Sequence, residues 1–228
     1  MAVCQKNKLI DNNDYKYIKS TEDHSSIFVL TWDEIMTMYN LDIEDKLLSK
    51  VRDVFCFQCF TGQRYGDIQS LKWRDIKEEK GKMYWYLYQL KTKNTKPIRI
   101  PIMPMAKEIL MKYQTNNKEL HHNVFSAPHN AVQNKKLKEL GLKSKLKGEF
   151  TTIMKQGFRR IEEVKKRYEK LSTHCARKSF ISISIEKGMS ISAIQKISGH
   201  TTIRAMKPYI ELSQQFVEDE LLDAWSNS

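Results

Sequence analysis

The sequence predicts a mainly α-helical domain with one small antiparallel β-sheet, an α+β fold. Apolar residues recur at helical spacing over most of the chain beyond residue 27. The segment 83–102 departs from this pattern, because aromatic, β-favouring residues are followed by a polar turn and then by alternating apolar residues. With 228 residues, 40% of them apolar, the chain can form one large domain or two small ones.

The first 26 residues lack hydrophobic periodicity and are rich in Asn, Asp and Lys. We expect an N-terminal arm or linker at 1–26 and a folded domain at 27–228. No secretory signal is recognisable in this arm, and no segment approaches the roughly 18 continuous apolar residues of a membrane span. We therefore expect a cytoplasmic protein that is not associated with a membrane and whose four cysteines stay reduced.

The first helices are predicted by capping residues and by apolar spacing. Thr31 and Glu34 form a capping-box pair that opens a helix. A second helix is expected to end near Gly62, and a short third helix to span about 65–71. These residues therefore predict a helical N-terminal half.

The middle of the chain contains the expected sheet. Segment 83–102 predicts a β-hairpin or part of a three-stranded sheet, and 105–113 returns to helical spacing. The basic stretch that follows is also expected to be helical, with a break near Gly148.

Two further helices are expected towards the C-terminus. The segment HCARKSFISISIEKG predicts a helix that ends at Gly188. Ser190 then caps a helix that Gly199 stops, which places His200 just beyond a helix end. The tail 211–225 is amphipathic, and we expect it to pack on its own domain or to dock onto a neighbouring subunit.

The positive charge of the chain is concentrated. Lys and Arg number 39 and Asp and Glu 27, a net charge of +12, and residues 135–170 hold thirteen of these cations and five of the acids. A concentrated basic surface favours a polyanionic partner, because each neutralised phosphate releases condensed counterions. The alternative is a solvated helical face, since Glu162, Glu163 and Glu169 lie among the cations. We favour contact with nucleic acid.

Several residues could together cut and rejoin a phosphodiester without a metal. That reaction needs an oxygen nucleophile, cations that stabilise the phosphate in the transition state, and a proton donor for the leaving oxygen. Taken singly, an Arg, His or Tyr is more often a surface or packing residue. The candidates are Arg64, Lys91, Lys93, His174, Arg177, His200 and Tyr209.

Four sequence motifs in a fixed order indicate a function more specifically than any single residue does. The segments FTGQRYGDIQSLKWRDI, KTKNTKPIRIPI, THCARKSF and SGHTTIRAMKPY follow one another along the chain. Together they resemble the boxes of the tyrosine recombinase, or phage integrase, family over about residues 30–212. The sequence is similar to integrases of conjugative or mobilisable transposons.

The resemblance implies a role for each residue that matches a family box. Tyr209 would be the nucleophile that forms a 3′-phosphotyrosyl link, and Arg64 and Arg177 would hold the non-bridging oxygens of the phosphate. His174 would act as a base or hydrogen-bond donor, and His200 would hold the phosphate or orient the nucleophile.

The resemblance also implies a hairpin lysine as general acid. Lys91 matches the K-T pattern, whereas counting back from Pro101 favours Lys93, and we choose Lys91. Asp67 would orient Arg64 or its loop, with a helix-surface carboxylate as the alternative. Cys175 is expected to be a packed thiol rather than a nucleophile.

The family comparison implies a partner and an assembly. The partner would be double-stranded DNA. The protein would be a monomer in free solution and a homotetramer on DNA, assisted by DNA-bending proteins. It would be associated with the nucleoid and come from a bacterium, a phage or another mobile element. No cofactor is expected, because the sequence has no Walker or dinucleotide motif and core packing of Cys56 and Cys59 is favoured over zinc. The core-binding domain that usually precedes the catalytic domain is not recognisable.

Two other functions remain open at this point. The chain could be a DNA-binding module of the same fold without catalysis, which would bind DNA in a salt-sensitive way but form no covalent adduct. It could also be similar to a type IB topoisomerase, which shares the chemistry but does not pair two sites. We favour the recombinase, because every catalytic role has a candidate residue.

Overall fold

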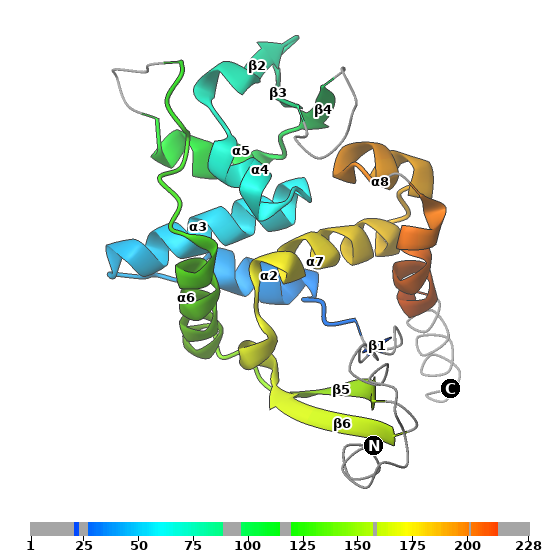
Figure 1. Cartoon of the computed structure of the whole chain (residues 1–228). Coiled ribbons are helices and arrows are strands. Elements are labelled where there is room, and N and C mark those ends of the chain that lie inside the picture. The colour runs from blue at the N-terminus through cyan, green and yellow to red at the C-terminus, as the bar shows by residue number, and fades with distance from the viewer. Residues whose placement is uncertain are drawn as a thin grey trace, which may run out of the picture.

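Helix α3 (Lys46–Thr61) lies at the centre of the molecule, and most of the other helices pack around it (Figure 1). The computed structural model describes residues 21–22, 27–88, 97–114, 120–156, 159–200 and 202–213. The helices are α2 (Trp32–Tyr39), α3 (Lys46–Thr61), α4 (Tyr65–Ser70), α5 (Pro104–Lys112), α6 (Asn130–Lys143), α7 (Thr173–Glu186) and α8 (Ile191–Ser198). Short 3₁₀ turns are η2 (Trp73–Asp75), η3 (Arg167–Lys170) and η4 (Ile203–Met206), and residues 207–213 are helical.

The hydrophobic core forms around α3, which packs against α2, α5, α6 and α7. Phe57 of α3 lies at the middle of an aromatic cluster, with its ring centroid 5.0 Å from that of Phe125 and 6.2 Å from that of Trp85. All three side chains are almost fully buried. The removal of this much aromatic surface from water stabilises the scaffold that carries the site.

The β structure differs from the single sheet that the sequence predicts. One antiparallel sheet has the order β2-β3-β4 (Ile76–Glu79, Lys82–Leu87, Ile98–Pro101), as the aromatic segment 83–102 indicates. A second antiparallel sheet has the order β1-β5-β6 (Thr21–Glu22, Glu149–Gln156, Arg159–Lys166). The fold class, mainly α with small antiparallel sheets, is confirmed, but there are two sheets among the described residues.

The second sheet corrects the prediction that the whole basic stretch is helical. Helix α6 is present, but the chain after Gly148 forms the hairpin β5–β6 instead of a second basic helix. Ile161 and Val164 are spaced as on one helical face, yet in the strand they point to opposite faces and both are exposed. The short strand β1 also lies within the segment 1–26 that we expected to be an arm, and it pairs with β5.

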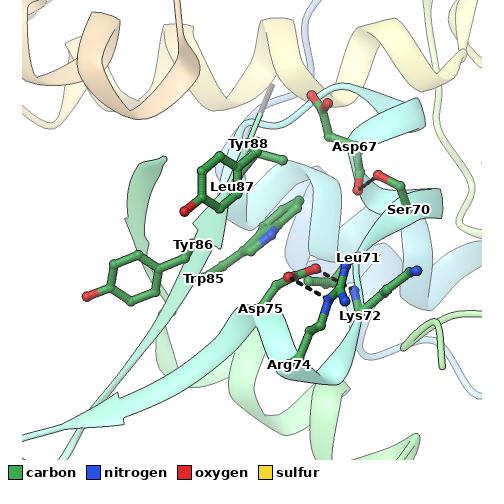
Figure 2. Close-up of a pocket in the computed structure, with 10 residues that line it drawn as sticks. All are labelled: Asp67, Ser70, Leu71, Lys72, Arg74, Asp75, Trp85, Tyr86, Leu87 and Tyr88. Atoms are coloured by element: carbon green, nitrogen blue, oxygen red, sulfur yellow. Dashed lines mark hydrogen bonds and ion pairs between the residues drawn. The ribbon is translucent and has the colours of Figure 1, made fainter. Parts of the chain in front are cut away.

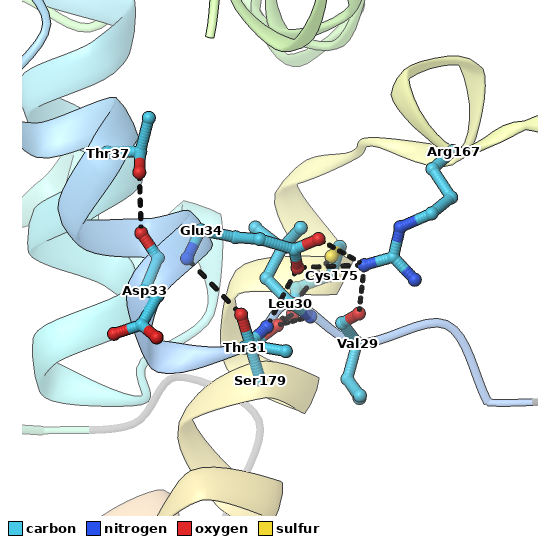
Figure 3. A network of polar contacts seen from close by, with 9 residues as sticks. All are labelled: Val29, Leu30, Thr31, Asp33, Glu34, Thr37, Arg167, Cys175 and Ser179. Atoms are coloured by element: carbon cyan, nitrogen blue, oxygen red, sulfur yellow. Dashed lines mark hydrogen bonds and ion pairs between the residues drawn. The ribbon is translucent and has the colours of Figure 1, made fainter. Parts of the chain in front are cut away.

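The predicted helix ends are confirmed. The Thr31 hydroxyl accepts from the Glu34 amide at 3.2 Å while the Glu34 carboxylate accepts from the Thr31 amide at 2.9 Å. Nη2 of Arg167 lies 2.8 Å from both carboxylate oxygens of Glu34 and donates to them. The Ser179 hydroxyl of α7 accepts a 2.8 Å hydrogen bond from the Leu30 amide (Figure 3). These bonds fix the start of α2 against α7 and against the turn that precedes α7.

The cysteines predicted to be core residues lie in the core. Cys56, Cys59 and Cys175 are buried free thiols, and burial raises the pKa of the Cys175 thiol to about 12. A buried thiol with a raised pKa is a poor nucleophile. Among the helices that the structure describes, none is long and apolar enough to cross a membrane.

Candidate active site

Helix α7 supplies the buried centre of the candidate site through Arg177. This side chain is 3% exposed, and its Nη1 donates a 2.8 Å hydrogen bond to the Gly62 carbonyl oxygen. Its Nη2 lies 3.2 Å from Nδ1 and 3.4 Å from Nε2 of His200. Desolvation by burial, followed by repulsion from Arg64, lowers the pKa of Arg177 to about 10, so the guanidinium is still charged at neutral pH.

The loop between α3 and α4 requires a glycine. Gly62 has φ +70°, in the left-handed region that glycine adopts without strain. An added Cβ would lie 2.3 Å from a ring carbon of Phe180 on α7. Gly62 therefore allows the loop to approach α7 closely enough for its carbonyl to accept from Arg177.

Arg64 begins α4 at the end of the same loop. Its backbone amide donates to the Asp67 carboxylate at 3.3 Å, so Asp67 holds the loop as the sequence predicts. The Arg64 side chain is half-buried, and within the described ranges no hydrogen bond or ion pair holds its guanidinium. Repulsion from Arg64 lowers the pKa values of Arg177, His174 and His200, which places its charge close to all three.

His200 follows the glycine that ends α8, as predicted. Gly199 has φ +69° and turns the chain so that the imidazole faces Arg177. The Ser198 hydroxyl lies 2.8 Å from Nδ1 of His200 and donates to the Ile194 carbonyl at 2.6 Å. Burial, then the charges of Arg177 and Arg64, lowers the pKa of His200 to about 4, which keeps the ring neutral at pH 7.

Gln63 and Ser198 are the residues of this site that sequence reasoning missed. Gln63 is fully buried, and its amide nitrogen donates 2.8 Å bonds to the carbonyls of Thr61 and Ile197. The second bond joins the Arg64 loop to the end of α8 across 134 positions of sequence. The only local signal was a polar residue between the glycine and arginine of the first motif.

His174 lies one turn before Arg177 on α7, on the exposed side of the site. Desolvation, then the positive charges of Lys178, Arg177 and Arg64, lowers its pKa. The ring therefore favours the neutral form, which can accept a proton.

Tyr209 lies in the helical residues 207–213, and its side chain is 8% exposed. The ring packs in a small hydrophobic cluster with Phe180, Ile194 and Met206. Desolvation raises the pKa of the hydroxyl, while the positive charge of Arg177 opposes this rise. The phenol is thus protonated at neutral pH and lies within the field of the cation that could stabilise its anion.

The hairpin lysines and most of the amphipathic tail fall outside the residues that the structure describes. Lys91 and Lys93 belong to segment 89–96, which follows β3. The end of β3 and Asp67 line one cavity of 200 Å³, and Tyr88 at its rim is exposed (Figure 2). Strand β3, which precedes Lys91 and Lys93 in the chain, and Asp67, which holds the Arg64 loop, therefore line the same cavity.

The described residues thus bring five of the six predicted site residues into one region. Arg64, His174, Arg177 and His200 come from three separate segments, and Tyr209 comes from a fourth. Positive charge dominates the region, because two guanidinium groups lie near two imidazoles. Such a region is suited to hold a phosphate and to stabilise negative charge that develops on it.

Comparisons with known proteins agree with this geometry. The XerC tyrosine recombinase of Pediococcus pentosaceus (strain ATCC 25745 / CCUG 21536 / LMG 10740 / 183-1w) is 20% identical in an alignment 226 residues long. This alignment covers 94% of this chain and 68% of that protein. Among solved structures, XerH recombinase in a post-cleavage complex with a palindromic difH substrate aligns with a TM-score of 0.60 and 19% identity. That alignment covers 85% of this chain but 52% of XerH, so the chain spans about half the length of XerH.

Two further solved structures share the fold. A lambda integrase dimer bound to a COC′ core site aligns with a TM-score of 0.58 and 20% identity, over 91% of this chain and 68% of that one. The Tn1549 transposon integrase in complex with transposon right-end DNA aligns with a TM-score of 0.55 and 16% identity, over 89% and 64%. The model of the phage integrase family matches residues 29–215. The chain therefore belongs to the phage integrase family, the tyrosine recombinases.

Proposed function

We propose that this protein cuts and rejoins double-stranded DNA through a covalent link between Tyr209 and the 3′ phosphate, in the integration and excision of a mobile element. The observation that carries the proposal is the buried Arg177, which lies against His200 and whose charge acts on the Tyr209 hydroxyl. Residues 27–228 would form the catalytic unit, with 1–26 as an arm that reaches β5 through β1.

The two arginines would hold the non-bridging oxygens of the scissile phosphate. Guanidinium remains charged at any physiological pH and can donate two parallel hydrogen bonds to a phosphate. The pentacovalent transition state carries more negative charge on these oxygens than the ground state does, so the arginines would stabilise it selectively. Arg177 is already positioned by Gly62, while the Arg64 guanidinium is available to the substrate.

Tyr209 would supply the attacking oxygen. Its hydroxyl loses a proton as the oxygen forms a bond to phosphorus, and the bond from phosphorus to the 5′ oxygen breaks. The 5′ oxygen leaves and takes a proton from a general acid. Attack by a 5′ hydroxyl on the phosphotyrosine reverses these steps and releases Tyr209, so the bond energy is conserved.

His174 and the hairpin lysine would transfer the protons, and His200 would help to bind the phosphate. Neutral His174, with its lowered pKa, is suited to accept the Tyr209 proton or to hydrogen-bond the phosphate. His200 would hold the phosphate beside Arg177. Lys91 would protonate the leaving 5′ oxygen, with Lys93 as the alternative, and neither residue lies in the described part of the chain.

DNA is the partner that the site chemistry favours. The related structures hold XerH on a palindromic difH substrate, lambda integrase on a COC′ core site and Tn1549 integrase on transposon right-end DNA. We further propose that monomers assemble into a homotetramer on DNA with the help of DNA-bending proteins. The protein would be associated with the nucleoid and would come from a bacterium, a phage or another mobile element.

The experiment that tests the proposal is a search for an SDS-resistant protein–DNA adduct. The protein is incubated, without magnesium, with nicked duplexes made from a library of fragments that flank the gene. Tyr209→Phe is the matched control, because it removes the nucleophilic oxygen and keeps the packed ring. We expect an adduct with the wild-type protein and none with the variant.

The outcomes separate the candidate functions. An adduct that persists in Tyr209→Phe would contradict the assignment of the nucleophile. Salt-sensitive binding without any adduct would favour a non-catalytic DNA-binding module. Relaxation of supercoiled DNA without joining of two sites would favour a topoisomerase.

A further inference from the structure

A second cavity, with a cationic lining, lies beside the candidate active site. It has a volume of 190 Å³, and its walls come from β5, from η3 and from the first turns of α7. Its polar lining residues are Thr152, Lys170, Ser172, His174 and Lys178. No carboxylate is among the described residues that line it, so its electrostatic character is positive.

His174 joins this cavity to the active site. His174, Arg177 and Lys178 are three and four positions apart on α7, so the imidazole lies between the two cations. The charges of Lys178, Arg177 and Arg64 all act on His174, and the same residue forms part of the cavity wall. A polymer of phosphates held at the arginines could therefore extend directly into this cavity.

The polar groups of the cavity have hydrogen-bonding capacity left over. The Lys170 ammonium uses one of its three protons to donate to the Thr152 hydroxyl at 2.8 Å. Ser172 is the N-cap of α7, but its side chain makes no capping bond. Lys178 forms no hydrogen bond or ion pair with any residue that the structure describes. Apart from the bond between Lys170 and Thr152, these donors do not pair with each other in the described structure, and they are available to an anion.

We propose that this cavity binds a backbone phosphate of the DNA strand next to the phosphate held by Arg64 and Arg177, with Lys170, Lys178 and Ser172 as its ligands. The inference rests on the proposed function, because it takes DNA as the substrate. A free phosphate ion has the same recognition chemistry and is the alternative occupant. The cavity would fix the register of the strand, so that the scissile phosphate reaches Tyr209.

The first test measures how DNA affinity depends on salt, in the Tyr209→Phe background so that no strand is cut. Each lost phosphate contact should lower the slope of log Kobs against log salt concentration by about 0.9. Lys178→Gln removes a cation that makes no other described bond, so it should lower the slope without loss of folding. Lys46→Gln is the matched control, because Lys46 is exposed at the far end of α3 from the Gly62 loop.

The second test uses mass spectrometry to measure the protection of lysine amines from acetylation in the same Tyr209→Phe protein under three conditions. These are a duplex oligonucleotide, inorganic phosphate at matched ionic strength, and no addition. We expect the duplex to protect Lys170 and Lys178 but not Lys46. Protection by the duplex alone, or by both additions, supports a phosphate site that DNA occupies.

Other results would overturn the inference. Protection by inorganic phosphate alone, with an unchanged slope in Lys178→Gln, would mean that the cavity takes free phosphate instead of DNA. Protection by neither addition would mean that it is not a phosphate site. Both tests use the Tyr209→Phe protein, which cannot cut DNA, so they report on phosphate binding and not on cleavage. If they failed while the wild-type protein still formed an adduct, this inference would be wrong and the proposed function would still hold.

Discussion

The two arginines of the site are held in different ways. Arg177 is buried, donates to the Gly62 carbonyl and faces His200. Arg64 is half-buried, and no group in the described ranges pairs with its guanidinium. The site thus has a buried half, around Arg177, Gln63, Ser198 and His200, and an open half, around Arg64 and His174.

The buried half is formed at an electrostatic cost, because folding removes the charged Arg177 guanidinium from water. The fall in the pKa of Arg177 from 12.5 to about 10 means that folding disfavours the cation by about 3 kcal/mol. A bound phosphate would supply the missing negative charge. The buried half is therefore positioned before the substrate arrives, and the substrate removes the cost of that positioning.

The largest effect is expected from removing each arginine in turn. Arg177→Met should lower the rate of adduct formation by about 10²–10³-fold and should also raise stability. The relieved cost exceeds the roughly 2 kcal/mol expected for the loss of both the bond to Gly62 and the contact with His200, which predicts a modest net gain in stability.

Arg64→Met is the matched variant in the open half. It should lower the rate similarly but change stability by less than about 0.5 kcal/mol, because its charge is better solvated. Urea unfolding of both variants without DNA checks the comparison. Equal stability changes in the two variants would remove the distinction between the halves.

Gln63→Leu should give the next largest effect. It removes the bonds to the Thr61 and Ile197 carbonyls, which we expect to cost about 2 kcal/mol of folding free energy. Gln133→Leu is the control, because Gln133 is equally buried and donates to the Val51 carbonyl at 3.0 Å, in a bond between α6 and α3.

Both glutamine variants should unfold at lower urea concentrations, but only Gln63→Leu should slow adduct formation when both are assayed where they are fully folded. Equal adduct rates for the two variants would show that the link between the Arg64 loop and α8 does not position the site.

Ser198→Ala should have a smaller effect, about 1 kcal/mol in stability and roughly tenfold in rate. The variant removes the hydroxyl that lies 2.8 Å from His200, and the ring loses a contact that orients it. Ser182→Ala is its control, since Ser182 is also fully buried and donates instead to Glu186 at 3.1 Å. A shift in the His200 NMR titration should appear in Ser198→Ala alone.

Local signals in the sequence predicted the helix ends but not the contacts between distant segments. Gly62, Gly199 and the Thr31 capping box depend on neighbouring residues, so each could be recognised in the sequence and is found in the structure. The bond from Gln63 to Ile197 depends on tertiary packing across the domain, which no local pattern encodes.

The β5–β6 hairpin was mispredicted for a different reason. Its strand β6 is polar on both faces and lacks the alternation that marks a half-buried strand, while Ile161 and Val164 imitate a helical period. The positions of the site residues came from the motif resemblance. Residue chemistry alone identified which groups could act on a phosphate, but not that Arg64 and Arg177 lie near each other.

The pH dependence of stability should show the smallest difference between the buried and the open half. His200 has a folded pKa of about 4 against an ordinary value of 6.5, so between these values the unfolded chain binds more protons than the folded protein. Stability should therefore fall as the pH falls through this window, by at most about 1 kcal/mol between pH 6.5 and 5.5. His200→Gln should flatten this part of the profile, measured by urea unfolding. His174 lies in the open half, so His174→Gln should flatten the pH profile of stability less than His200→Gln does. If His174→Gln flattened the profile equally or more, His174 would be the more desolvated histidine, which would contradict the division into a buried and an open half.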